Sequence, residues 1–252
     1  RPKENKLNKI KHHLYGFISV KKNFSTGEWL KLVKKRILEI NKRKKIPIIV
    51  GGTGLYFSSL TDGLVEIPNI PTKIRNKIRL LQKQLGQKKF YSKLIKLDPK
   101  IKNRIEKNDV QRSIRFYEIK YHTKKSILDW FKKTKKYFSN DDFIKLYINY
   151  PREELIKRIN KRVDKMFKEG AIKEVIKFNQ LKAKETNSSH KVIGIKEISE
   201  YLSKKSSLDQ AKDLISIKTR QYAKRQVTWA HSKMQSWYKI DPKSINSFLK
   251  KI

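Results

Sequence analysis

The segment "IPIIVGGTGLYF", residues Ile46 to Phe57, carries the most information about the fold. A short apolar run rich in β-branched residues leads into three glycines around Thr53, and a second apolar stretch follows. This order predicts a buried strand over Ile46–Val50, then a glycine-rich loop, then a helix. P-loops share this order, but they need a Lys followed by Ser or Thr to reach the terminal phosphates of a nucleotide, and none follows Gly54. The loop therefore predicts a site and leaves open what that site binds.

The residues before this segment indicate an α/β fold. Residues 28–45 carry apolar side chains at helical spacing, at Trp29, Val33, Ile37 and Ile40. A helix followed by a short, wholly apolar strand is typical of a parallel sheet covered by helices on both faces. We therefore expect a parallel sheet core, with residues 51–54 beyond the carboxyl end of a strand, where such sheets bind ligands.

The composition excludes several classes of protein. The 252 residues include no cysteine, so disulfides, thiolate catalysis and cysteine metal sites are excluded. No apolar run approaches the roughly 20 residues that a membrane span needs. We expect a cytoplasmic protein that makes no membrane contact. The chain starts at Arg1 without a signal-peptide pattern, so we also expect it to be a fragment of a longer protein.

The charge balance is extreme, with 63 Lys and Arg against 23 Asp and Glu and a net charge of +40. One explanation is a polyanionic partner, most naturally a nucleic acid. The other is a Lys-, Ile- and Asn-rich composition that follows from AT-rich coding DNA. Both stay open. Because only 13 of the 63 basic residues are Arg, each Arg marks a candidate position for planar, bidentate hydrogen bonding.

A basic, helical insertion is predicted between two parts of the α/β core. The predicted boundaries are residues 1–66 for the first part, 67–138 for the insertion and 139–252 for the second part. Residues 67–97 contain nine Lys and Arg and no acidic residue, with apolar side chains at helical spacing. Candidate helix caps follow along the insertion at Thr72, Asp98, Asp109 and Ser126, and Gly86 is the predicted end of the helix that starts at Thr72.

The chain is expected to return to the sheet after the insertion. Residues 142–151, "DFIKLYINYP", and residues 237–241, "WYKID", predict strands. Between them, one helix is predicted from Pro151 to Gly170, and a longer one from a cap at Ser206 to Trp229.

Three helical segments bring two basic side chains onto one face. The pairs are Arg112 with Arg115, Arg158 with Arg162, and Arg220 with Lys224. A single pair in so basic a chain indicates only a solvated face. Three pairs among 13 arginines favour contacts with a diphosphate or an RNA backbone. The five histidines and the capping carboxylates show no pattern of a metal site or a general base.

These motifs, taken together, resemble the tRNA dimethylallyltransferase (tRNA isopentenyltransferase) family in the family's own order. They are "RPKENKLNKIKHHLYGF", "PIIVGGTGLYF", "DPKIKNRIEKNDVQRSIRFYEI", "RINKRVDKMFKEGAIKEV", "VIGIKE" and "TRQYAKRQVTW". The resemblance implies a P-loop-kinase-like core with a helical insertion that grips the anticodon stem-loop of tRNA. It implies transfer of a dimethylallyl group from dimethylallyl diphosphate to the exocyclic amine of the adenine 3′ of the anticodon, with Mg²⁺ assisting the leaving group. We expect a monomer.

The family's functional residues carry over onto particular positions of this sequence. The resemblance implies that Thr53 lies at the reaction centre, against the substrate adenine or its backbone. Gly51, Gly52 and Gly54 would let the loop backbone and Thr53 come close to that adenine. It implies tRNA contacts at Arg75, Gln111, Arg112, Ser113, Ile114, Arg115, Lys191, Val192, Ile193, Gly194, Ile195 and Lys196. Arg158, Arg162, Arg220 and Lys224 are the candidates for binding the diphosphate or nearby RNA phosphates.

The sequence departs from the family pattern in three places. Glu106-Lys107 replaces the usual His-Pro, and Ile195 replaces the usual Tyr. The amino-terminal P-loop and the Asp-Ser segment after it, which supplies the proposed base, are expected before Arg1, so this chain alone is expected to be inactive. Two alternatives stay open beside the transferase: an adenylate isopentenyltransferase acting on AMP, and a non-catalytic basic RNA-binding protein. A nucleotide kinase fits less well, because no lid-like arginine arrangement is evident.

Overall fold

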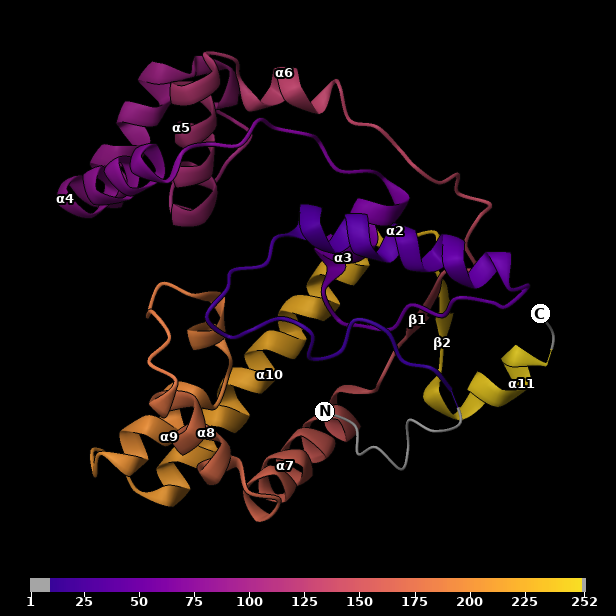
Figure 1. Cartoon of the computed structure of the whole chain (residues 1–252). Coiled ribbons are helices and arrows are strands. Elements are labelled where there is room, and N and C mark those ends of the chain that lie inside the picture. The colour runs from indigo at the N-terminus through magenta and orange to yellow at the C-terminus, as the bar shows by residue number, and fades with distance from the viewer. Residues whose placement is uncertain (1–9, 251–252) are drawn as a thin grey trace. The chain divides into compact units, whose positions relative to one another are not determined.

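The computed structural model describes residues 10–250, so the first nine residues of the "RPKENKLNKIKHHLYGF" motif lie outside the described part (Figure 1). The chain divides into two compact units: unit 1 comprises Arg1–Phe57 with Asn140–Ile252, and unit 2 comprises Ser58–Ser139. Unit 2 contains the whole predicted insertion, 67–138. Within residues 10–250, none of the helices has both the length and the apolar composition of a membrane span.

Helices predominate in both units. The α-helices are α2 (Thr26–Lys42), α3 (Gly54–Thr61), α4 (Thr72–Leu97), α5 (Val110–Thr123), α6 (Ile127–Phe131), α7 (Arg152–Lys168), α8 (Ala171–Gln180), α9 (Ile195–Leu202), α10 (Leu208–Lys233) and α11 (Ile245–Leu249). Short 3₁₀ turns are η1 (Pro99–Ile101), η2 (Ser188–Lys191) and η3 (Pro242–Ser244), and the strands are β1 (Leu146–Ile148) and β2 (Tyr238–Ile240).

The sheet of unit 1 consists of β1 and β2, which are parallel and adjacent (Figure 1). Leu146 pairs with Tyr238 and Ile148 with Ile240. Strands β1 and β2 both lie inside segments predicted as strands, so the mixed α/β character and the parallel sheet are confirmed. A parallel pair needs a crossover connection, and here helices α7 to α10 supply it.

The predicted strand at Ile46–Val50 is wrong for the described chain. The segment forms no strand, and Ile46, Ile48 and Val50 are 87%, 80% and 80% exposed. A strand needs a neighbour to accept and donate its backbone hydrogen bonds, and no described residue pairs with this segment. Its side chains still alternate between exposed and partly buried positions, as the period of an extended chain requires.

The crossover helices of unit 1 share a small apolar core. Val163 of α7, Val175 of α8, Ile198 of α9 and Ile215 of α10 are buried against one another with Ala171. Each is spaced so that it faces the neighbouring helix, and burying such a side chain stabilises the fold by about 1.5–3 kcal/mol. The core fixes α10 as the long helix against which α7 and α9 pack.

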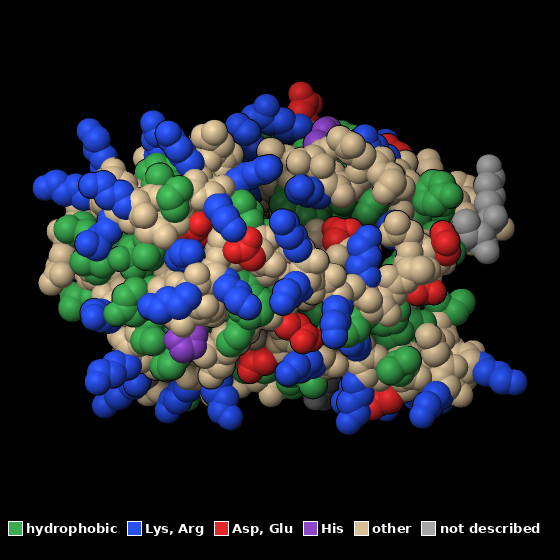
Figure 2. Space-filling view, turned by 90° about the horizontal axis from the view of Figure 1, so that it is seen from above, with side chains coloured by type: hydrophobic (Ala, Val, Ile, Leu, Met, Phe, Trp, Pro, Cys, Tyr) green, Lys and Arg blue, Asp and Glu red, His purple; other side chains and the backbone are tan. Residues whose placement is uncertain are grey.

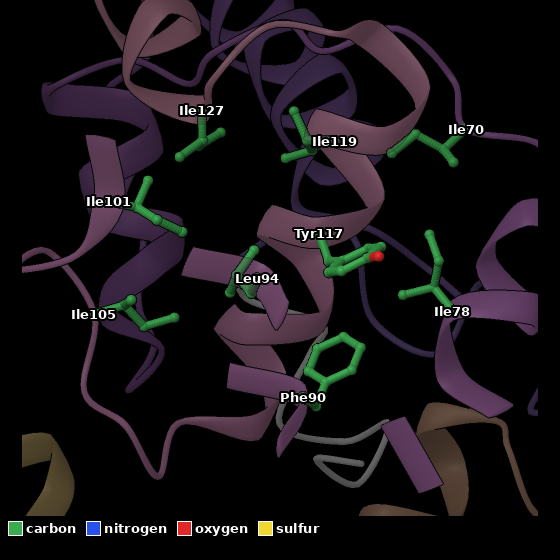
Figure 3. Packing of buried hydrophobic residues seen from close by; sticks show 9 residues of the cluster. All are labelled: Ile70, Ile78, Phe90, Leu94, Ile101, Ile105, Tyr117, Ile119 and Ile127. Atoms are coloured by element: carbon green, nitrogen blue, oxygen red, sulfur yellow. The ribbon is translucent and has the colours of Figure 1, made fainter. Parts of the chain in front are cut away.

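Unit 2 is built on α4 and α5, which lie side by side (Figure 1). Their buried face includes Ile78, Phe90 and Leu94 from α4 and Tyr117 and Ile119 from α5 (Figure 3). Helix α4 is kinked at Gly86, whose φ of 68° and ψ of 167° are not helical. The sequence predicted that the helix ends there, and the structure shows that it bends and continues to Leu97. The kink lets both halves of α4 contribute to one core.

Candidate active site and nucleic-acid interface

The loop at Gly51–Thr53 leads directly into α3, as predicted. The backbone amide of Tyr56 donates to the Thr53 carbonyl over 3.0 Å and starts the first turn. The Tyr56 ring stacks on Trp29 of α2, with centroids 4.3 Å apart, and burial raises the pKa of Tyr56. The loop is therefore anchored on both sides, by α2 and by the helix that it starts.

Two of the loop glycines lie where side chains of α10 approach closely. The Gln226 side-chain amide donates to the Gly52 carbonyl over 2.8 Å. A Cβ on Gly52 would lie 2.1 Å from that amide nitrogen, and a Cβ on Gly54 would lie 2.3 Å from the Trp229 ring. A Cβ on Gly51 would meet no other atom within 4 Å. Packing against the Trp229 ring thus explains Gly54, whereas the flexible Gln226 side chain at Gly52 could move aside. The sequence had suggested both glycines for close approach of a substrate.

Thr53 is the exposed polar side chain of this loop. Across residues 10–250 its hydroxyl makes no hydrogen bond to another protein group, whereas the hydroxyls of Ser25, Ser126 and Ser207 cap helices. A hydroxyl can donate one hydrogen bond and accept two. Thr53 therefore presents an unused donor and acceptor to solvent at the start of α3.

The predicted diphosphate ligands lie on α7 and α10, which pack together in unit 1. Arg158 and Arg162 are exposed, and the Arg158 guanidinium lies 4.8 Å from the centre of the Tyr150 ring. Lys224 is exposed and Arg220 is half-buried. Because an α-helix turns about 100° per residue, Arg220 and Lys224 lie more than about 100° around α10 from Gln226 and Trp229. The structure therefore separates this pair from the face that contacts the Gly51–Thr53 loop.

The segment Lys191–Lys196 divides into exposed and core-facing residues. Lys191, Val192 and Lys196 are exposed, while Ile193 and Ile195 pack against the α7–α10 core. Gly194 is buried with φ of 108°, a conformation that favours glycine. The exposed three offer their side chains to a ligand most fully, whereas Ile193 and Ile195 are only partly exposed.

A buried carboxylate that the sequence did not single out holds this segment in place. Glu197, 3% exposed, accepts a hydrogen bond from the Gly194 amide over 2.8 Å and pairs with Lys218 of α10. Burial alone would raise the pKa of Glu197, but hydrogen bonds from Lys218 and Gly194 outweigh it and lower that pKa. The Glu three residues after Gly194 was a recognisable capping signal.

The predicted RNA-binding residues of unit 2 differ in how far their side chains are exposed to solvent. Gln111 is exposed, and so is Arg112, which donates to the Asp109 carboxylate over 3.0 Å. Ser113 is fully buried and accepts from the Gln87 side chain over 3.1 Å, and Ile114 packs against the core.

Arg75 and Arg115, both half-exposed, converge on Glu118, and Arg79 joins them there. The sequence analysis predicted Arg75 and Arg115 as separate tRNA contacts, and it singled out neither Glu118 nor Arg79. The i, i+3 spacing of Arg115 and Glu118 was the available signal.

Comparison with known proteins identifies the family. A model described as "IPP transferase" matches residues 1–233. The chain belongs to the IPP transferase family. It is 56% identical over all 252 residues to a tRNA dimethylallyltransferase of Pelagibacter ubique, of which it covers 80%. It is also 41% identical over 235 residues to a tRNA dimethylallyltransferase of Rickettsia massiliae, covering 93% of this chain and 65% of that one.

Solved structures of relatives have the same fold as this member of the family. A eukaryotic dimethylallyltransferase described as acting on tRNA matches with a TM-score of 0.80 at 27% identity, over all of this chain and 66% of that one. A tRNA isopentenylpyrophosphate transferase from Staphylococcus epidermidis matches with a TM-score of 0.62 at 28% identity, over 99% of this chain and 84% of that one. The family expected from the motifs is therefore confirmed.

The donor set for the expected Mg²⁺ does not appear in residues 10–250. No group of three or more His, Cys, Asp or Glu side chains is placed there to hold a metal ion. Mg²⁺ prefers oxygen ligands in near-octahedral geometry.

Proposed function

We propose that this chain catalyses the dimethylallyl transfer of the IPP transferase family, with a tRNA anticodon loop as the acceptor. In this reaction the exocyclic nitrogen of adenine forms a bond to the allylic carbon, the carbon–oxygen bond to diphosphate breaks, and the amine loses a proton to a base. The observation that carries the proposal is similarity to tRNA dimethylallyltransferases over the whole chain. The relevant adenine is the one 3′ of the anticodon.

The Gly51–Thr53 loop supports a role for Thr53 at the acceptor. Its hydroxyl is exposed and unused by the described residues, so it can bond a base edge or the RNA backbone without breaking a structural contact. Glycines 52 and 54 let α10 close in behind the loop, which fixes the backbone from which Thr53 projects. Such fixed positioning of a reactant is a large source of rate acceleration.

Unit 2 supports RNA as the acceptor. It carries 22 Lys and Arg against 7 Asp and Glu. For the molecule as a whole, Figure 2 shows more basic than acidic side chains on the face in view. A basic surface of this kind binds a phosphate backbone, whereas a free mononucleotide needs no such unit. An unpaired loop also lets the target base leave its stack at little cost.

Cationic side chains in unit 1 support binding of the diphosphate. We assign Arg158, Arg162, Arg220 and Lys224 to the leaving diphosphate or to nearby RNA phosphates. Arg158 and Arg162 are exposed on one face of α7 and have no acidic partner in the described chain, so both guanidiniums are available for an anion. Fixed cations placed where negative charge develops favour departure of the leaving group.

The test is dimethylallyl transfer from labelled dimethylallyl diphosphate to three acceptors: a tRNA, its isolated anticodon stem-loop, and AMP. We expect transfer to both RNAs and none to AMP, for this chain together with the amino-terminal residues of its relatives. Transfer to AMP alone would assign the adenylate reaction instead. RNA binding with no transfer to any acceptor would assign a non-catalytic RNA-binding protein.

A further inference from the structure

Three arginines from two helices meet at one buried carboxylate in unit 2. The Glu118 side chain is 2% exposed, and its two oxygens lie 3.6 Å from Arg75 Nε, 3.6 Å from Arg79 Nε and 3.5 Å from an Arg115 terminal nitrogen. Arg75 and Arg79 are four residues apart on α4, and Arg115 and Glu118 are three apart on α5. The packing of α4 on α5 brings them together. We call these four residues the Glu118 cluster.

The Glu118 cluster carries an excess of two positive charges. Among the described residues Glu118 is the acidic partner of all three arginines, and one carboxylate balances only one guanidinium. Arg75 and Arg79 approach Glu118 most closely through Nε, and neither makes a hydrogen bond to it at that distance of 3.6 Å. The arginine side chains are 41%, 51% and 40% exposed, so all three are accessible to a ligand from solvent.

Stabilisation of the fold does not account for this arrangement. A buried ion pair is a weak source of stability because of its desolvation cost, and each added guanidinium repels the others. Two buried polar atoms of the cluster, Arg75 Nε and Glu118 Oε1, have no hydrogen-bond partner among the described residues. Burial and the neighbouring Arg75 both lower the pKa of Arg115, although Glu118 opposes them. A second anion on the solvent side would satisfy the excess charge.

The ligand class follows from the donors. Guanidinium forks bind phosphate oxygens in a bidentate manner, and lysine is the default base of this chain, with 13 arginines among 63 basic residues. Three of those 13 at one carboxylate, on a unit with 22 basic and 7 acidic residues, match a phosphate group within an RNA backbone.

We propose that the Glu118 cluster is an RNA phosphate site, in which Arg79 is a further phosphate ligand and Glu118 is a positioning residue that sets the three arginine forks. This inference rests on the proposed tRNA acceptor and adds to it the residues that hold one backbone phosphate. Glu118 touches no RNA; it acts by fixing Arg75, Arg79 and Arg115 before the RNA arrives.

Glu118→Gln gives the sharpest test, because two hypotheses predict opposite signs. Removing a carboxylate raises the net charge by one, so a surface acting only through total charge binds an anticodon stem-loop as tightly or more tightly. A positioning role predicts weaker binding, by about tenfold at 0.1 M salt, since the forks lose their common anchor. KM for the RNA rises, and KM for dimethylallyl diphosphate stays unchanged. Equal or tighter RNA binding by a folded Glu118→Gln protein overturns the proposal.

Arg79 provides an independent test that does not depend on the buried carboxylate. Arg79→Lys keeps the charge and loses the fork, so we expect an unchanged salt slope with about fivefold to tenfold weaker binding. Arg79→Ala is expected to flatten the slope of log K against log salt by about 0.7–0.9 as well. Lys93→Ala removes an exposed charge from the other half of α4 and is the matched control for charge alone. If Arg79→Lys binds like the wild type, or Lys93→Ala loses as much as Arg79→Ala, the site is refuted.

The controls separate this inference from the proposed function. Wild-type transfer to the anticodon stem-loop tests the function by itself. Where the wild type transfers and all cluster variants bind RNA normally, the cluster proposal fails and the function stands. Where the wild type does not bind the stem-loop, the function fails, and the cluster proposal fails with it. Thermal unfolding of each variant, with a midpoint within a few degrees of the wild type, shows that the loss is not one of folding.

Discussion

At the scale of single residues, the atoms that pack beside two of the glycines help to explain the composition of the glycine-rich loop. The sequence suggested that glycines 51, 52 and 54 leave room for a substrate. The structure assigns two of them to α10, because the Gln226 amide and the Trp229 ring occupy the space that a side chain would need. These partners are more than 170 residues away along the chain, so no local pattern could have predicted them. Thr53 is exposed, as a site residue has to be, and its role at the site stays a prediction.

Gly54→Ala and Gly51→Ala form a matched pair for this assignment. A methyl group at Gly54 would lie 2.3 Å from the Trp229 ring, whereas one at Gly51 meets nothing within 4 Å. We expect Gly54→Ala to lower the free energy of unfolding by about 1–3 kcal/mol through overpacking, and Gly51→Ala to leave it nearly unchanged. Urea unfolding measures both. Equal stability of the two variants would remove the packing role of Gly54.

Thr53→Ala and Thr53→Ser separate a substrate contact from a structural role. The Thr53 hydroxyl has no hydrogen-bond partner in the described chain, so Thr53→Ala should unfold at nearly the wild-type urea concentration. A lost hydrogen bond to the acceptor should lower kcat/KM for RNA by about tenfold, and Thr53→Ser should restore most of it. If stability and turnover were lost to the same extent, Thr53 would have only a structural role in starting α3.

At the level of the element, the sequence predicted strands β1 and β2 and two of the four helix caps correctly. Thr72 follows the cap position of α4, Asp98 makes no capping hydrogen bond, and Ile46–Val50 forms no strand. The caps at Asp109 and at Ser126 were correctly predicted, because a cap depends on residues within one turn. The long C-terminal helix begins one residue later than expected, capped by Ser207 with Gln210. By contrast, strand formation at Ile46–Val50 depends on a distant hydrogen-bonding neighbour, which local sequence does not supply.

Helix α9 is expected to make stability depend on pH through Glu197. Lys218 and the Gly194 amide lower the pKa of Glu197 below its ordinary value of 4.5, against the effect of burial. A lowered folded-state pKa stabilises the fold above about pH 4.5, and this contribution is lost as the pH falls through the folded-state pKa. Glu197→Gln should therefore cost about 1–2 kcal/mol at pH 7 and progressively less in acid.

The measurement is urea unfolding of wild type and variant from pH 7 down to pH 3. Glu200→Gln is the matched control, because Glu200 pairs with exposed Lys196 on the surface of the same helix, where an ion pair contributes little. A Glu197→Gln deficit that is constant over this range would contradict the pH-dependent role.

Helix α5 presents Arg112 at its amino-terminal end, where Asp109 both caps the helix and pairs with the guanidinium. We expect Arg112→Ala to weaken tRNA binding and flatten its salt dependence by about 0.7–0.9 in slope. Stability should change little, because the Arg112 side chain is 68% exposed. Filter binding over 50–200 mM NaCl measures the slope, and an unaltered slope would exclude a phosphate contact at this position.

For the whole molecule, the net charge of +40 dominates behaviour in solution. Self-repulsion among like charges destabilises a compact state, and salt screens it, since the Debye length falls from about 30 Å at 0.01 M to 10 Å at 0.1 M. We expect the thermal midpoint to rise between 10 mM and 300 mM NaCl. A stem-loop RNA should raise it most at low salt, where binding is strongest. A midpoint that falls with added NaCl would show that favourable ion pairs outweigh the repulsion.

The exposed row of Ile46, Ile48 and Val50 has a consequence for handling the protein. Short β-branched segments with open backbone groups are the sequences that seed aggregation. Here four cations, Lys42 to Lys45, stand immediately before the row, and Pro47 interrupts it, which is how gatekeeper residues protect such segments. Salt, which is expected to stabilise the fold, also screens these four cations and so weakens their protection. Concentrated, high-salt stocks are therefore the conditions in which the protein should precipitate first, and Ile48→Lys the substitution that should keep it dissolved.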